Sequence, residues 1–144
     1  MKHVAVLMGG WSAEREVSMN SGLACAEALK KSGYQVTPVD VGRNIAETLS
    51  EIKPDVCFNA LHGRYGEDGY IQGLLEIIGI PYTHSGVLAS ALAMDKPVAK
   101  SLFVQAGIPV ADGKILTRQE IQDGANYPKP FVVKPLNEGS SVGV

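Results

Sequence analysis

The stretch HVAVLMGG, residues 3–10, sets the fold class of this 144-residue chain. An almost entirely apolar run of strand length ends at a pair of glycines, which is typical of a buried strand followed by a turn. Similar runs follow at residues 34–41 and 55–61, with a shorter one at 80–83. Segments with helical spacing separate them. Because parallel strands need long crossover connections, the alternation predicts an α/β fold, an open parallel sheet with helices on both faces.

Helix signals fill the segments between these runs. The first helix is predicted to begin near Ser18. The second is predicted to begin at Asn44, in an approximate capping box with Glu47. Residues 70–78 and about 87–94 give two more helices. These segments supply the crossovers that a parallel sheet requires.

The chain after Asp95 has a different pattern. Asp95 caps a predicted helix, and strands are expected at residues 114–116 and 131–135. This part is too short for a comfortable domain and stops on a loop of glycine and serine. We therefore predict one complete domain at residues 1–95 and the incomplete start of a second at residues 96–144.

Composition and charge exclude several classes of protein. The formal net charge is −2, and the 13 basic residues are scattered, so no nucleic-acid partner is expected. The longest run of apolar or small residues is too short to cross a bilayer, and the start of the chain does not fit a signal peptide. Cys25 and Cys57 lack a paired spacing, and the three histidines are dispersed. We expect a cytoplasmic protein with reduced core thiols and no metal site.

Two loops are expected to meet where ligands bind, at the carboxyl ends of the parallel strands. Residues 9–16 follow the first strand, and residues 61–69 follow the third. Glu14 would repel a phosphate and attract an ammonium group, although a solvated helix start also explains it. His62 is either a ligand contact or a histidine bonded to backbone. Three other charged residues of the second loop are expected to screen one another in solvent: Arg64, Glu67 and Asp68.

Two lysines and the last loop suggest an anion. Lys134 interrupts an apolar strand, and Lys96 lies in a first helical turn, where the helix dipole opposes its charge. A bound anion would explain both positions, as would simple exposure. Residues 138–144 offer consecutive backbone N–H groups and little side-chain bulk, which suits phosphate oxygens.

Three motifs together resemble the D-alanine:D-alanine ligases: GGWSAEREVS at 9–18, ALHGRYGEDGYIQGLLEIIGIPYTHSGVLASALAMDK at 60–96 and VVKPLNEGSSVG at 132–143. The resemblance implies a Rossmann-like, substrate-binding pre-ATP-grasp domain, followed by the start of an ATP-grasp α+β domain. It also implies ATP-dependent ligation of two D-alanine molecules through an acyl phosphate, in the cytoplasm, for peptidoglycan precursor synthesis. The implied cofactors are ATP and Mg²⁺ or Mn²⁺.

The resemblance also implies roles for single residues. Glu14 would bind the ammonium group of the first D-alanine, and Ser140 would complete the same catalytic network. The implied substrate contacts are Glu14, Val17 and His62. The implied nucleotide contacts are Lys96, Lys134, Ser140 and Ser141. The metal ligands would lie past residue 144, so we expect a fragment that is inactive by itself. The resemblance also implies a homodimer through the N-terminal domain.

Two alternatives stay open at this point. A ligase of the same class could join D-alanine to D-lactate or D-serine, because the residues that select the second substrate would lie outside this sequence. A protein of another class, a non-catalytic Rossmann-like binding module, would share the sheet. Against a dinucleotide site, the pattern G-x-G-x-x-G is absent after the first strand.

Overall fold

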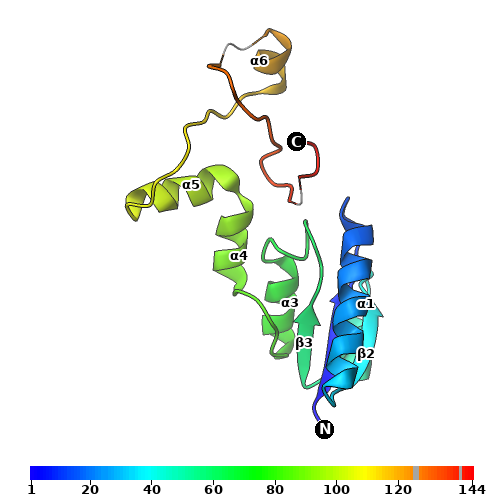
Figure 1. The fold of residues 1–144 in the computed structure, drawn as a ribbon. Helices are drawn as coiled ribbons and strands as arrows, with labels where there is room; N and C mark the ends of the chain where they lie inside the picture. Colours follow the sequence, from blue (N-terminus) through cyan, green and yellow to red (C-terminus); the bar gives the residue numbers. More distant parts are fainter. Residues whose placement is uncertain (125–126, 140) are drawn as a thin grey trace.

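A parallel sheet of three strands forms the centre of the computed structural model, which describes residues 1–124, 127–139 and 141–144 (Figure 1). Strand β1 (His3–Met8) lies in the middle, between β2 (Gln35–Asp40) and β3 (Val56–Asn59). Both pairings are parallel, with Leu7 opposite Val39 on one side and Asn59 on the other. The order β2–β1–β3 therefore confirms the predicted open parallel sheet.

Side chains of β1 supply both halves of the core. Ala5 and Leu7 point to one face of the sheet, and Val4, Val6 and Met8 point to the other, because side chains alternate along a strand. All five are buried. The first face is covered by α2 (Ile45–Ile52) and α3 (Tyr70–Ile78), and the second by α1 (Arg15–Lys31). A strand buried on both faces needs the unbroken apolar run that its sequence has.

The predicted fourth strand is reduced to a single bridge. Residues 80–83 approach β3 in parallel through Tyr82, which pairs with Cys57. The Cys57 amide donates to the carbonyl of Pro81 (2.8 Å), and the Thr83 amide donates to the carbonyl of Cys57 (3.0 Å). Cys57 is a free thiol, and burial raises its pKa to about 12, as expected for an unreactive core cysteine.

Two predicted helix starts are wrong in detail. Helix α1 begins at Arg15, three residues before the expected cap, and Ser18 is buried inside its first turn. Asn44 does precede α2, but its side chain makes no capping hydrogen bond, so the expected box with Glu47 does not form. Asp95 was placed correctly, since its carboxylate accepts a hydrogen bond from the Val98 amide (3.0 Å) at the start of the fifth helix.

The chain beyond the sheet is helical and irregular. It contains α4 (Val87–Met94), α5 (Lys96–Gln105) and α6 (Arg118–Gln122). The strands expected at 114–116 and 131–135 are wrong, because neither segment pairs with another in the described part of the chain. None of the described residues from 91 to 144 is buried. A division into two units at residue 95 stays a prediction.

The terminal segment folds back toward the carboxyl end of the sheet, above β3 and the start of α1 (Figure 1). Lys96 contributes to this path, because its ammonium group donates to the backbone carbonyls of Pro135, Leu136 and Glu138. Among the described residues, no helix has the length and apolar character needed to cross a membrane.

Two glycines in helices allow a matched test of this packing. In α1, a Cβ added to Gly22 would lie 2.4 Å from the Cβ of buried Met8, whereas a Cβ added to Gly73 in α3 would meet nothing within 4 Å. Gly22→Ala should lower the free energy of unfolding by about 1–3 kcal/mol through overpacking. Gly73→Ala should raise it by up to about 1 kcal/mol, because alanine favours the helix. Urea denaturation of both variants measures the two changes.

Candidate functional site

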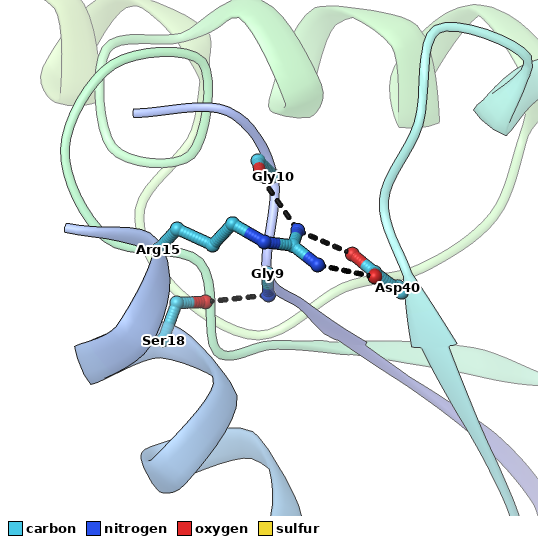
Figure 2. Close-up of polar contacts among 5 residues, drawn as sticks. All are labelled: Gly9, Gly10, Arg15, Ser18 and Asp40. Atoms are coloured by element: carbon cyan, nitrogen blue, oxygen red, sulfur yellow. Dashed lines mark hydrogen bonds and ion pairs between the residues drawn. The ribbon is translucent and has the colours of Figure 1, made fainter. Parts of the chain in front are cut away.

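A buried hydroxyl joins the loops that leave β1 and β3. The Ser18 Oγ donates to the carbonyl of Ala60 (2.7 Å) and accepts from the amide of Gly9 (2.9 Å). Figure 2 shows the second of these bonds, at the point where β1 ends. The residue that the sequence suggested as a helix cap therefore fixes the separation of the two loops.

Ser12 makes a second link between the same loops. Its hydroxyl donates to the carbonyl of His62 (2.8 Å) and accepts from the amide of Glu14 (3.1 Å). The Ser12 side chain thus holds the backbone of Glu14 close to that of His62. Sequence reasoning passed over Ser12, although its position in the loop after the first strand was a usable signal.

The two predicted residues lie together, and a third joins them. One ligand atom each of Glu14, His62 and Glu67 lies within 4.8 Å of the others. Glu14 is only 1% exposed, and neither of its carboxylate oxygens has a hydrogen-bond partner among the residues that the structure describes. The two loops therefore meet as predicted, and a solvated helix start no longer explains Glu14.

Glycines bring the backbone close to the Glu14 carboxylate. A Cβ on Gly63, whose φ is +67°, would lie 2.8 Å from Glu14 Oε1, and one on Gly139 would lie 3.1 Å from it. The first glycine belongs to the loop after β3, and the second to the terminal loop. The terminal loop is therefore part of the wall around Glu14. Ser140, the predicted catalytic neighbour of Gly139, lies outside the described residues.

The prediction that Arg64, Glu67 and Asp68 screen one another in solvent is wrong. Glu67 turns inward and accepts a hydrogen bond from the Gly63 amide (2.7 Å), and Asp68 accepts one from the Tyr65 amide (3.2 Å). The Arg64 guanidinium lies 5.2 Å from the centre of the Tyr65 ring. Backbone amides of the loop thus hold the carboxylates that were expected to face solvent, because a tight loop leaves such donors unpaired.

Two buried amide side chains shape the same loop from below. Asn59 and Gln72 both donate to the carbonyl of Gly66 (2.8 Å each), and the Asn59 side-chain oxygen accepts from the amide of Leu61 (3.1 Å). Both side chains are about 1% exposed. Polar residues at buried positions of a strand and a helix were the sequence signal for this support.

An apolar cavity of about 120 Å³ lies beside the carboxylate cluster. Trp11 and Tyr65 both line it, with ring centres 4.9 Å apart and ring planes tilted by 43°, and Arg43 lies 5.2 Å from the Trp11 ring centre. His62 forms part of its lining. Trp11, to which the sequence analysis assigned no role, therefore packs within the loops of the site.

Arg15, the immediate neighbour of Glu14, is directed elsewhere. Its guanidinium binds both carboxylate oxygens of Asp40 (2.7 and 2.6 Å) and the carbonyl of Gly10 (2.7 Å), as Figure 2 shows. The hydrogen bonds and charge of Arg15 hold the pKa of the Asp40 carboxyl below its usual value. The nearest arginine in sequence is therefore engaged with Asp40 rather than with Glu14.

Among the described residues, those predicted to contact the nucleotide do not form a cluster of the kind that Glu14 and His62 form. The Lys96 ammonium donates to three backbone carbonyls, those of Pro135 (3.1 Å), Leu136 (3.2 Å) and Glu138. Lys134 and Ser141 are exposed, as is the predicted substrate contact Val17. Their roles stay predictions.

Comparison with known proteins points to one family of ligases. A family model described as the D-ala D-ala ligase N-terminus matches residues 42–85. The D-alanine–D-alanine ligase of Parvibaculum lavamentivorans is 62% identical over 143 residues, which cover 99% of this chain and 46% of that protein. A crystal structure of the ligase from Bacillus anthracis matches with a TM-score of 0.78 and 36% identity, over 99% of this chain and 48% of that one.

The chain belongs to the D-alanine–D-alanine ligase family. It spans about half the length of the curated relatives it matches. A second crystal structure of the Bacillus anthracis ligase, in complex with ATP, matches with a TM-score of 0.76 and 33% identity, over 96% of this chain and 48% of that one. The resemblance read from the three motifs is therefore confirmed, and the α/β sheet is that of the solved ligases.

Removal of the Ser18 hydroxyl tests the link between the loops of this family member. Ser18→Ala leaves the buried amide of Gly9 and carbonyl of Ala60 without their partner, at a cost of roughly 1–3 kcal/mol for each group. We expect the free energy of unfolding to fall by about 2–6 kcal/mol in urea denaturation. Ser50→Ala removes an exposed hydroxyl in α2 and should change it by less than about 0.5 kcal/mol.

The ion pair of Asp40 predicts a pH dependence of stability. Because the folded pKa of Asp40 is lowered, the stabilisation is present above the unfolded pKa and is lost as the pH falls through the folded value. Asp40→Asn should therefore lower the Tm at neutral pH, and the difference from the unmodified chain should shrink below about pH 4. Thermal unfolding from neutral to acid pH measures it. Asp112→Asn, at an exposed position, should show no such trend.

Proposed function

We propose that this chain supplies the D-alanine-binding part of an ATP-dependent ligase that forms D-alanyl-D-alanine. The observation that carries the proposal is the buried carboxylate of Glu14, unpaired among the described residues and placed beside His62 at the ligand edge of the sheet. Membership of the ligase family supports the choice of substrate.

A bound cation would stabilise the buried carboxylate of Glu14. A buried carboxylate without hydrogen bonds is costly, and an ammonium group at contact distance would offset the cost by a gross attraction of about 4 kcal/mol in a surface-like dielectric. The net value of such a charge-assisted hydrogen bond is about 1.5–3 kcal/mol. The ammonium group of a first D-alanine has the size and charge required. Its carboxylate would then lie toward His62.

The nucleotide part of the proposal depends on residues of the terminal segment. ATP, when bound, would supply the phosphoryl group that activates the carboxylate of the first D-alanine. Lys134, which is exposed, could contact a phosphate without rearrangement. Lys96 would first have to release backbone carbonyls that it holds in this structure. The position of Gly139 beside Glu14 supports a contribution of Ser140 to the substrate site.

Other properties of the proposed enzyme follow from the family. We place the reaction in the cytoplasm and in the synthesis of a peptidoglycan precursor. Mg²⁺ or Mn²⁺ would accompany ATP on residues outside this sequence. Exposed Ile77 on α3 and Leu88 on α4 support a homodimer through this domain. Ligation of D-alanine to D-lactate or D-serine, and a non-catalytic binding role, are the alternatives that kinetics with each second substrate would separate.

Glu14→Gln in the ligase that contains this chain tests the role of the carboxylate. The amide keeps the volume of the side chain but loses the charge. We expect kcat/KM for D-alanine at the first site to fall roughly ten- to hundred-fold, since about 1.5–3 kcal/mol is lost. The KM for ATP should stay nearly unchanged. Steady-state kinetics with each substrate varied in turn measure both constants.

Glu16→Gln, at an exposed position two residues along α1, serves as the control and should leave both constants unchanged. Equal losses for D-alanine and ATP in Glu14→Gln would mean that the carboxylate supports the fold rather than the amine.

A further inference from the structure

The cluster at the sheet edge contains more acid than one ammonium group balances. Glu14 and Glu67 contribute two carboxylates, and His62 contributes an imidazole. With both carboxylates ionised and the imidazole neutral, the formal charge of the three side chains is −2, which a divalent cation balances. Nitrogen and oxygen donors in this proportion are ligands that Zn²⁺ takes in proteins.

The hydrogen bonds of His62 leave one ring nitrogen suited to a metal. The Ser21 hydroxyl donates its proton to the carbonyl of Val17 (2.8 Å). The contact of 3.2 Å between Ser21 Oγ and His62 Nε2 must then have the ring nitrogen as donor. The lone pair of the neutral ring consequently lies on Nδ1. Histidine ligands of metals almost always donate through their second nitrogen in this way.

The carboxylates meet the other requirements of a ligand set. Glu67 accepts a hydrogen bond from the Gly63 amide through Oε2 (2.7 Å), which orients its side chain toward the loop interior. Glu14 is 1% exposed, and its two oxygens have no partner among residues 1–124, 127–139 and 141–144. A buried carboxylate in that condition is suited to bind a cation.

We propose that Glu14, His62 and Glu67 form a Zn²⁺ site. Zinc holds such ligands at roughly 2.0–2.2 Å, so neighbouring ligand atoms lie about 3.4 Å apart in a tetrahedral site. The three ligand atoms lie within 4.8 Å of one another, and the half-buried side chain of Glu67 can rotate to close the difference. Water completes the coordination shell. Mg²⁺ competes poorly, because it prefers oxygen ligands.

The site shares Glu14 with the proposed amine contact, so zinc and an amino acid would exclude one another there. The zinc site is nevertheless independent of the proposed reaction. It needs only residues of this chain, and Glu67 serves the metal without being required for the amine. Zinc binding can therefore succeed or fail whatever the substrate of the ligase is.

Titration of the 144-residue chain with Zn²⁺ by isothermal calorimetry tests the site directly. We expect one zinc ion per chain, bound in the presence of excess Mg²⁺. His62→Asn and Glu67→Gln should each weaken binding at least tenfold. Ser21→Ala should weaken it about ten- to hundred-fold, as loss of a hydrogen bond to a metal-bound histidine does. Thermal unfolding without metal verifies that each variant is folded.

Two control variants separate this site from other zinc-binding groups. Cys25→Ser removes the half-buried thiol, and Glu27→Gln removes an exposed carboxylate on α1. Neither change should affect the affinity. Absence of saturable binding, equal affinity in folded Glu67→Gln, or loss of binding in Cys25→Ser would overturn the proposal.

Discussion

The hydroxyls of Ser12 and Ser18 hold the ends of two parallel strands at a fixed separation, and the geometry of the site depends on that constraint. The strands β1 and β3 leave the sheet side by side, so their loops start close together. Ser18 ties the first residues of these loops, and Ser12 ties the segments that carry Glu14 and His62. Residues about fifty positions apart in sequence can thereby act on one ligand.

The main energetic cost of this arrangement is the burial of the Glu14 carboxylate. Its neighbour Arg15, a natural counter-ion, is instead fixed on Asp40 at the end of β2. The Glu14 carboxylate has no hydrogen-bond partner among the described residues and lies where water has little access, a position that strengthens any cation contact. The fold supplies the compensation through strand β1, whose buried side chains stabilise both faces of the sheet. A well-packed centre allows the edge to retain an unfavourable group for binding.

Sequence patterns predicted the features that follow from periodicity and from the rule for parallel sheets. The three strands, the helices on both faces and the meeting of Glu14 with His62 are of this kind. The patterns failed where tertiary contacts decide. Ser18 has the side chain of a helix N-cap, but its hydroxyl instead forms hydrogen bonds with two buried backbone groups. Residues 131–135 have strand propensity, yet a strand needs a partner in space, and the described chain provides none. Glu67 was assigned to solvent because sequence does not reveal which loop amides lack acceptors.

Trp11 gives the site a built-in optical reporter. It is the single tryptophan of the chain, and it lies over Tyr65 in the loop that follows His62. Intrinsic fluorescence excited at the red edge of the protein spectrum therefore originates from Trp11 alone, in the loop that follows β1. The guanidinium of Arg43 beside the indole makes the emission sensitive to local charge and hydration. Occupancy of the neighbouring cluster can be followed without a dye, a label or a mutation.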